Sequence, residues 1–246
     1  TVHSDYRLDY LGRPFHRLTY GTINTISLRM FDYHIGVSDA MVQLLISRGF
    51  NPQKLFSIYN GVAFPPEKPS LSRGEYLESL GVSYDEDTVV FGIAARLNPV
   101  KDIATLIRGF AGACRKCPNI RLVIAGDGEE RQMLESLAKE TCPAGSVVFA
   151  GWVKDTDSFY HAIDVNMLTS LSEGSPYALV EGARMRCATI ATSVGGIPYM
   201  MESGVTGLLF TPRDVETLTS YMVRLVENPA FRRKLGENFY EKAEQV

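Results

Sequence analysis

The stretch Val89–Ala95 reads Val-Val-Phe-Gly-Ile-Ala-Ala and is followed directly by Arg96 and, five positions later, by Lys101. Its apolar, mostly β-branched and aromatic residues predict a fully buried strand. From Ile103 to Phe110 the apolar residues recur at helical spacing, which predicts an amphipathic helix. Further short apolar runs follow at Arg121–Ala125, Val147–Ala150, Val165–Leu168, Thr189–Ala191 and Leu208–Phe210. Short apolar strands alternating with helices predict an α/β fold with a doubly wound parallel sheet, covered by helices on both faces.

Polar residues directly after these strands are candidate ligand contacts, because doubly wound sheets bind ligands at the carboxyl ends of their strands. Arg96 ends the first run, and Lys101 stands where the next helix begins, near Asp102. A planar guanidinium and a compact ammonium at one sheet edge suit a diphosphate. The spacing leaves a second interpretation open, in which Lys101 forms an ordinary ion pair with Asp102 or another surface carboxylate.

A second candidate site lies in the stretch from Leu171 to Glu181, after one of the predicted strands. Ser175 is a preferred N-cap and Pro176 a preferred first helical residue, so we expect a helix to begin there. The first backbone N–H groups of this helix form an anion site at the positive end of its dipole. These N–H groups belong to Tyr177, Ala178 and Leu179.

Two carboxylates flank this predicted anion site, Glu173 in the loop before the helix and Glu181 inside it. Carboxylates accept hydrogen bonds from sugar and ribose hydroxyls, which a nucleotide sugar carries on either side of its phosphates. In the alternative interpretation, Glu173 merely favours the helix N-terminus and Glu181 is solvated. We favour a binding site, because the loop, the anion site and the two cations all fall at one edge of the same sheet.

The segment Ala63–Ser70 contains three prolines and no apolar periodicity, which predicts a linker between two parts of the chain. Before it lie short helix and strand patterns, in which Ser38 is expected to cap a helix and Gly49 to end it. We therefore expect residues 1–66 to be the closing portion of one domain and residues 67–229 to form a second. Residues 230–246 are expected to form a final helix.

Composition limits the classes of function. Dividing 246 residues by about 150 per domain gives about 1.6, so we expect one complete domain and part of another. A net charge of -3 argues against binding to nucleic acid, because binding to the phosphate backbone normally needs a basic face. The four cysteines are too few and too scattered for a disulfide scaffold, which favours a cytoplasmic protein. Residues 1–66 hold six Lys/Arg and four Asp/Glu, an excess that is either a solvated face or a weak peripheral contact with the inner face of a membrane.

Together these motifs resemble the donor site of family 4 retaining glycosyltransferases of bacterial type, which have the GT-B fold of two Rossmann-like domains. The resemblance rests on Arg96-x-x-x-x-Lys101 and on Glu173 and Glu181, which seven residues separate. It covers nearly the whole chain. Supporting stretches are Asn60-Gly61-Val62, Ile124-Ala125-Gly126-Asp127-Gly128, Phe149-Ala150-Gly151-Trp152 and Ser193-Val194-Gly195-Gly196-Ile197-Pro198.

The resemblance implies an enzyme that moves a sugar from a nucleoside diphosphate sugar to a hydroxyl of a glycan or lipid-linked acceptor, in glycan or polysaccharide biosynthesis. Arg96, Lys101 and Glu173 are implied as catalytic residues, since the cations stabilise the leaving diphosphate and the carboxylate holds the sugar. No metal or other cofactor is expected, because these cations replace it. The implied donor-binding residues are His3 for the sugar, Glu181 for the ribose, Trp152 and Val153 for the base, Gly126, and, through the main chain, Ser175, Pro176, Tyr177, Ala178 and Leu179.

Departures from the family pattern leave alternatives open. Tyr199 stands where the family commonly has Glu, and Gly182 stands at a helical position where Ala is usual, at a cost of about 1 kcal/mol unless a close approach requires it. Most of the N-terminal acceptor domain has no counterpart, so we expect an N-terminally truncated chain whose last helix packs back toward its N-terminal part. The alternatives are a donor-binding module without transferase activity and another GT-B enzyme, such as a nucleotide-sugar epimerase.

Overall fold

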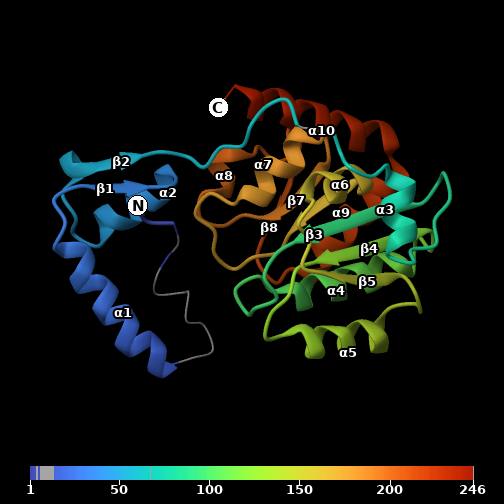
Figure 1. The fold of residues 1–246 in the computed structure, drawn as a ribbon, viewed down its shortest axis with the longest axis horizontal. Coiled ribbons are helices and arrows are strands. Elements are labelled where there is room, and N and C mark those ends of the chain that lie inside the picture. Colours follow the sequence, from blue (N-terminus) through green and yellow to red (C-terminus); the bar gives the residue numbers. More distant parts are fainter. Residues whose placement is uncertain (4, 6–13, 67, 246) are drawn as a thin grey trace.

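The computed structural model describes residues 1–3, 5, 14–66 and 68–245, and Figure 1 shows two groups of elements joined by an extended segment. The larger group is built on a six-stranded sheet with the order β5-β4-β3-β6-β7-β8, in which every pairing is parallel. This arrangement confirms the predicted doubly wound α/β fold. The strands are β3 (Val89–Ala94), β4 (Ile120–Ala125), β5 (Val147–Gly151), β6 (Val165–Leu168), β7 (Ala188–Thr192) and β8 (Leu208–Phe210).

Helices cover both faces of this sheet (Figure 1). One face is covered by α4 (Ile103–Cys114), α5 (Arg131–Thr141) and α9 (Val215–Glu227). The other face is covered by α3 (Arg73–Ser79), α6 (Thr156–Ala162), α7 (Tyr177–Arg184), α8 (Ile197–Met200) and α10 (Pro229–Glu244). Along β3, Phe91 and Ile93 are buried against the first face and Val90 against the second, as the alternation of side chains along a strand requires.

The smaller group comprises α1 (Pro14–Arg29), β1 (His34–Gly36), α2 (Asp39–Ser47), a short 3₁₀ helix (Pro52–Lys54) and β2 (Leu55–Ser57). Its two strands pair in parallel, and Val2 forms an isolated parallel bridge with Gly36. The Ser38 hydroxyl accepts a hydrogen bond from the Met41 N–H at 3.3 Å, which confirms the predicted cap of α2. Gly49 follows α2 with a φ of 84°, a left-handed conformation that glycine adopts without strain.

The C-terminal helix packs on α7 and β7. Its Tyr240 ring also lies edge-on to the Phe64 ring of the connecting segment, with 5.6 Å between the ring centroids. The helix therefore contacts the segment that leads to the smaller group, while the division into domains stays a prediction. In the described part of the chain we find no helix with the length and apolarity that crossing a membrane requires.

Candidate functional site

A cavity of about 410 Å³ opens at the carboxyl ends of β3 and β6, the edge at which the sequence predicts the site. Its walls come from the loop between β3 and α4, from the loop between β6 and α7, and from the first residues of the chain. The predicted site residues that line it are His3, Arg96, Lys101, Glu173, Ser175, Pro176, Tyr177, Ala178 and Glu181. The fold thus brings together residues that are far apart in the sequence.

Lys101 is held by a carboxylate of the site itself. Its Nζ lies 2.5 Å from Glu173 Oε1, and the two side chains are 27% and 10% exposed. The alternative pairing with Asp102 is not observed, since the Asp102 carboxylate accepts a hydrogen bond from the Thr105 hydroxyl at 2.7 Å instead. The ion pair therefore joins the two loops that form the cavity.

Arg96 is exposed, and the backbone on either side of it is held by two glycines. Gly126 packs on Ala95, and a Cβ added to Gly126 would lie 2.9 Å from the Ala95 carbonyl carbon. A Cβ on Gly128 would lie 2.7 Å from the carbonyl carbon of Leu97. Within the part of the chain that the structure describes, the Arg96 guanidinium has no ion-pair partner, so it is available to an anion in the cavity.

Helix α7 begins one residue later than predicted. Pro176 occupies the N-cap position and Tyr177 is the first helical residue, so the predicted Ser175 cap is wrong. The physical reason is competition from Asn60, whose backbone N–H donates to the Ser175 hydroxyl at 3.3 Å. The Asn60 side-chain amide also donates to the Ser175 carbonyl oxygen at 2.7 Å. Ser175 therefore fastens the connecting segment to the loop before α7.

The anion site at the start of α7 is smaller than the sequence predicts. The Leu179 N–H donates to the Pro176 carbonyl oxygen at 3.1 Å within the first turn, and Leu179 is fully buried away from the cavity. Among the described residues, the N–H groups of Tyr177 and Ala178 have no acceptor, and both residues line the cavity. Two backbone donors at a positive helix end therefore remain for an anion.

Glu181 is half-buried rather than solvated. It accepts a hydrogen bond from the hydroxyl of the fully buried Tyr160 at 3.3 Å. Burial raises the pKa of the Glu181 carboxyl, and it raises the pKa of Tyr160 well above its usual value. A carboxylate with little access to water gains from any ligand hydroxyl that donates to it.

The glycine that follows Glu181 is explained by a close approach. A Cβ on Gly182 would lie 2.8 Å from Cγ of Asn166, a fully buried residue of β6. The Asn166 side-chain amide donates to the Ala178 carbonyl oxygen in α7 at 2.9 Å. Gly182 thus lets α7 pack directly on β6, which fixes the position of Glu181.

The Gly-Gly turn after β7 supports the loop that carries Glu173. The Gly196 N–H donates to the Glu173 carbonyl oxygen at 3.2 Å, and Gly195, with a φ of 53°, leaves no room for a side chain beside the Glu173 backbone. Gly174 in turn packs on the carbonyl oxygen of His3. Close backbone packing therefore brings His3 of the smaller group to the cavity wall.

Four predicted donor-binding residues lie outside the cavity lining, namely Gly126, Trp152, Val153 and Leu179. Trp152 is 77% exposed just after β5, and Val153 packs beside the core under α3 and α6. Their contacts with a donor stay predictions. Tyr199 lines a separate cavity of about 450 Å³ between the connecting segment, α8 and α10.

Sequence reasoning missed two residues of the site. Asn60, which the family resemblance includes only as part of a supporting stretch and not as a site residue, lines both cavities and binds Ser175. Ser170 lines the cavity at β3 and β6, and its hydroxyl donates to Glu173 Oε1 at 2.5 Å. Ser170 lies two residues after the end of β6, so a stricter search of the positions after each strand finds it.

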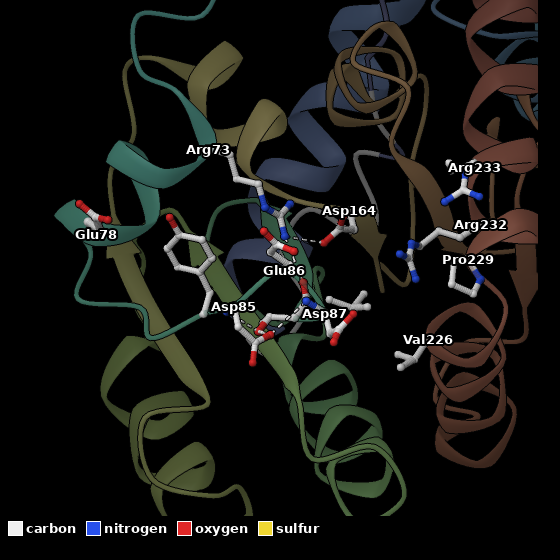
Figure 2. A pocket seen from close by; sticks show the side chains of 13 residues that line it. Arg73, Glu78, Asp85, Glu86, Asp87, Asp164, Val226, Pro229, Arg232 and Arg233 are labelled. Atoms are coloured by element: carbon white, nitrogen blue, oxygen red, sulfur yellow. Dashed lines mark hydrogen bonds and ion pairs between the residues drawn. The ribbon is translucent and has the colours of Figure 1, made fainter.

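A larger cleft of about 990 Å³ lies near the residues that precede β3 and β6, away from the predicted site (Figure 2). Figure 2 shows Arg73 directed toward Asp164, and their ion pair measures 2.9 Å. Arginines and carboxylates are mixed in its lining, which includes Asp85, Glu86, Asp87, Arg232 and Arg233. This mixture gives the cleft no uniform charge with which to recognise an anion.

Residues 81–242 match the family described as glycosyl transferases group 1. The chain belongs to the group 1 glycosyltransferase family. The lipopolysaccharide core biosynthesis glycosyltransferase LpsE of Rhizobium meliloti is 31% identical over 141 residues, which are 57% of this chain and 40% of LpsE. An uncharacterized glycosyltransferase of Methanocaldococcus jannaschii is 30% identical over 220 residues, covering 85% of this chain and 55% of that protein. This glycosyltransferase chain thus spans about half the length of the curated relatives it matches.

Solved structures of other glycosyltransferases share the fold. HepE of Anabaena in complex with UDP-glucose superposes with a TM-score of 0.78 at 25% identity, covering 87% of this chain and 59% of HepE. The C-terminal domain of LpcC from Francisella tularensis superposes with a TM-score of 0.66 at 22% identity, covering 75% of this chain and 97% of that domain. These likenesses confirm the predicted GT-B type of fold.

Proposed function

We propose that this group 1 glycosyltransferase binds a nucleoside diphosphate sugar in the cavity at β3 and β6 and transfers the sugar to an acceptor hydroxyl with retention at the anomeric carbon. Four side chains that meet at the start of α7 carry the proposal: Arg96, Lys101, Glu173 and Glu181. They match the diphosphate, the transferred sugar and the ribose of a nucleotide sugar. The natural acceptor class that fits the family resemblance is a glycan or a lipid-linked sugar.

The diphosphate is assigned to the cationic side of the cavity. Arg96 offers a planar fork, Lys101 a compact charge, and Tyr177 and Ala178 their free N–H groups. Negative charge grows on the diphosphate as the glycosidic bond breaks, and donors fixed in advance stabilise that charge more in the transition state than in the ground state. We propose that these groups stabilise the leaving diphosphate without a metal ion, and a transfer assay in the presence of EDTA tests this directly.

The two carboxylates are assigned to hydroxyl groups of the donor. Glu173, beside Lys101, accepts from the transferred sugar, and the half-buried Glu181 accepts from the ribose. Because burial disfavours the charged form of Glu181, a ribose hydroxyl replaces the hydrogen bonds that water supplies less well there. We place Trp152, Val153 and Gly126 toward the base, at the ends of β5 and β4.

The nucleotide is first sought among uridine compounds, because HepE is solved with UDP and with UDP-glucose. His3 of the smaller group lines the cavity, and we propose that it contacts the sugar and that the acceptor approaches from this side. The positive excess of residues 1–66 supports weak contact with an anionic membrane face on the cytoplasmic side.

Because the chain spans about half the length of its relatives, donor binding and sugar transfer are tested separately.

Thermal unfolding in the presence of UDP-glucose, GDP-mannose or ADP-glucose, with NAD as control, tests donor binding. A ligand at 100 times its dissociation constant adds about 2.7 kcal/mol to the free energy of unfolding, a readily measured shift in Tm. We expect one nucleotide sugar and its diphosphate to stabilise the protein and NAD to have no effect. Equal shifts with NAD and all sugars contradict the proposal. Product analysis with that donor then distinguishes transfer from binding alone and from epimerisation.

A further inference from the structure

The loop that follows β6 carries a connected set of hydrogen bonds around Glu173 and Lys101. The Ser170 hydroxyl and the Lys101 ammonium both bind Glu173 Oε1, each at 2.5 Å. The Thr192 hydroxyl, at the end of β7, donates to the Ser170 carbonyl oxygen at 2.6 Å. Ser170 is 2% exposed and Thr192 fully buried, so water does not compete for the bond between these two residues.

The same loop also fixes the backbone of Lys101. The Thr169 hydroxyl donates to the Lys101 carbonyl oxygen at 2.9 Å, and the Leu171 N–H donates to the Val100 carbonyl oxygen at 2.7 Å. The loop is therefore tied to the start of α4 on one side and to β7 on the other. Ser170 stands at the centre of this arrangement and touches the carboxylate.

The two oxygens of Glu173 are not equivalent. Oε1 accepts from both Ser170 and Lys101, whereas no donor among the described residues reaches Oε2. The terminal torsion of a glutamate is broad, so a lysine that binds one oxygen leaves the plane of the carboxylate, and with it the second oxygen, free to rotate. A short hydroxyl-to-carboxylate bond from a buried serine is charge-assisted and directional, and it removes that freedom.

We propose that Ser170 is a positioning residue that reserves Glu173 Oε1 for the protein and presents Oε2 to the hydroxyls of the transferred sugar. The inference rests on the proposed function. It explains how the site distinguishes a nucleoside diphosphate sugar from the nucleoside diphosphate alone. In the proposed donor site the diphosphate is assigned to Arg96 and Lys101 and the ribose to Glu181, so neither contacts this carboxylate. Loss of the Ser170 hydroxyl therefore weakens recognition of the sugar and leaves recognition of the nucleoside diphosphate in place.

Titration calorimetry with matched ligand pairs tests the proposal: UDP-glucose with UDP, GDP-mannose with GDP, and ADP-glucose with ADP. The pair in which the sugar changes affinity most in the wild type serves as reference. We expect Ser170→Ala to weaken nucleotide-sugar binding about tenfold and to change diphosphate binding less than twofold. Thr192→Val, which removes the bond to the Ser170 carbonyl at nearly constant volume, is expected to act in the same direction and more weakly.

Ser158→Ala is the matched control. The Ser158 hydroxyl is fully buried and donates to the Asp155 carboxylate at 2.6 Å, at the start of α6 and outside the cavity lining. Its loss should lower the Tm and leave both affinities unchanged. The inference is overturned if Ser170→Ala and Thr192→Val weaken binding of the nucleotide sugar and of the diphosphate equally. It is also overturned if these variants change neither affinity.

Glu173→Gln separates failure of this inference from failure of the proposed function. If Glu173→Gln retains the full preference of the wild type for the sugar-bearing ligand, Glu173 does not hold the sugar and the proposed function of this residue is wrong. If Glu173→Gln loses that preference while Ser170→Ala keeps it, only the positioning role is wrong. If the wild type binds none of the nucleotide sugars and none of the diphosphates, both the proposed function and the positioning role of Ser170 are contradicted.

Discussion

Replacing Lys101 by methionine removes the ion-pair partner of Glu173 at nearly constant side-chain length. Breaking a fully buried pair by removing one partner costs about 3–5 kcal/mol, whereas an exposed pair contributes up to about 1 kcal/mol. Here the side chains are 27% and 10% exposed, and Ser170 still donates to the carboxylate. We therefore expect Lys101→Met to lower the free energy of unfolding by about 2 kcal/mol.

The double variant Lys101→Met/Glu173→Gln distinguishes stability from binding. It leaves no unpaired charge in the cavity wall, so we expect it to recover at least half of the lost stability. Binding of the diphosphate is not recovered, because one charge-assisted contact of about 1.5–3 kcal/mol is absent in both variants, a loss of about 10- to 150-fold in affinity. Urea unfolding measures the first quantity and titration calorimetry the second. Wild-type diphosphate affinity in Lys101→Met, or a double variant no more stable than the single one, refutes this reasoning.

Three further predictions concern the loops and helix of the site. Burial raises the pKa of Glu181 above its ordinary value of 4.5, so the stability of the free protein falls as the pH rises through the folded-state pKa. Glu181→Gln should remove that fall in a series of Tm values against pH, and it should weaken nucleotide binding. An unchanged pH dependence of the Tm in Glu181→Gln contradicts this prediction. Gly182→Ala gains about 1 kcal/mol in helix propensity but overpacks against Asn166, whose Cγ lies 2.8 Å from the added Cβ. We therefore expect urea unfolding to show a free energy of unfolding that is lower by about 1–2 kcal/mol. A higher free energy of unfolding refutes the packing role. Gly195→Ala places a side chain at a φ of 53° against the Glu173 backbone, and calorimetry should show weakened nucleotide-sugar binding, whereas unchanged affinity shows that the turn does not support the loop.

The parallel sheet could be predicted because its strands are short, apolar and separated by helical patterns. Runs such as Val165–Leu168 and Leu208–Phe210 match the observed strands. The rule that ligands meet the carboxyl ends of strands also predicts Arg96 and Glu173 at the same edge of the sheet, and both residues line the cavity there. These predictions depend on local patterns that tertiary contacts do not override.

The details that could not be predicted come from contacts between distant segments. The cap of α7 shifts from Ser175 to Pro176 because Asn60, more than a hundred residues earlier, binds the serine hydroxyl. Glycine at position 182 is explained only once Asn166 is seen against it. Propensity describes each segment alone, so it does not report competition for a hydroxyl or the close approach of a helix to a strand.

Titration calorimetry of the diphosphate selected by thermal screening, into the wild type and into Arg96→Ala/Lys101→Ala, tests the central claim most directly. Arg96 and Lys101 line the cavity at the start of α7, and we assign the diphosphate to them. We predict that the wild type binds with a measurable heat, that Ser158→Ala binds equally well, and that the double variant loses at least about 100-fold in affinity. Equal affinity of the wild type and the double variant would contradict the assignment of this cavity as the donor site.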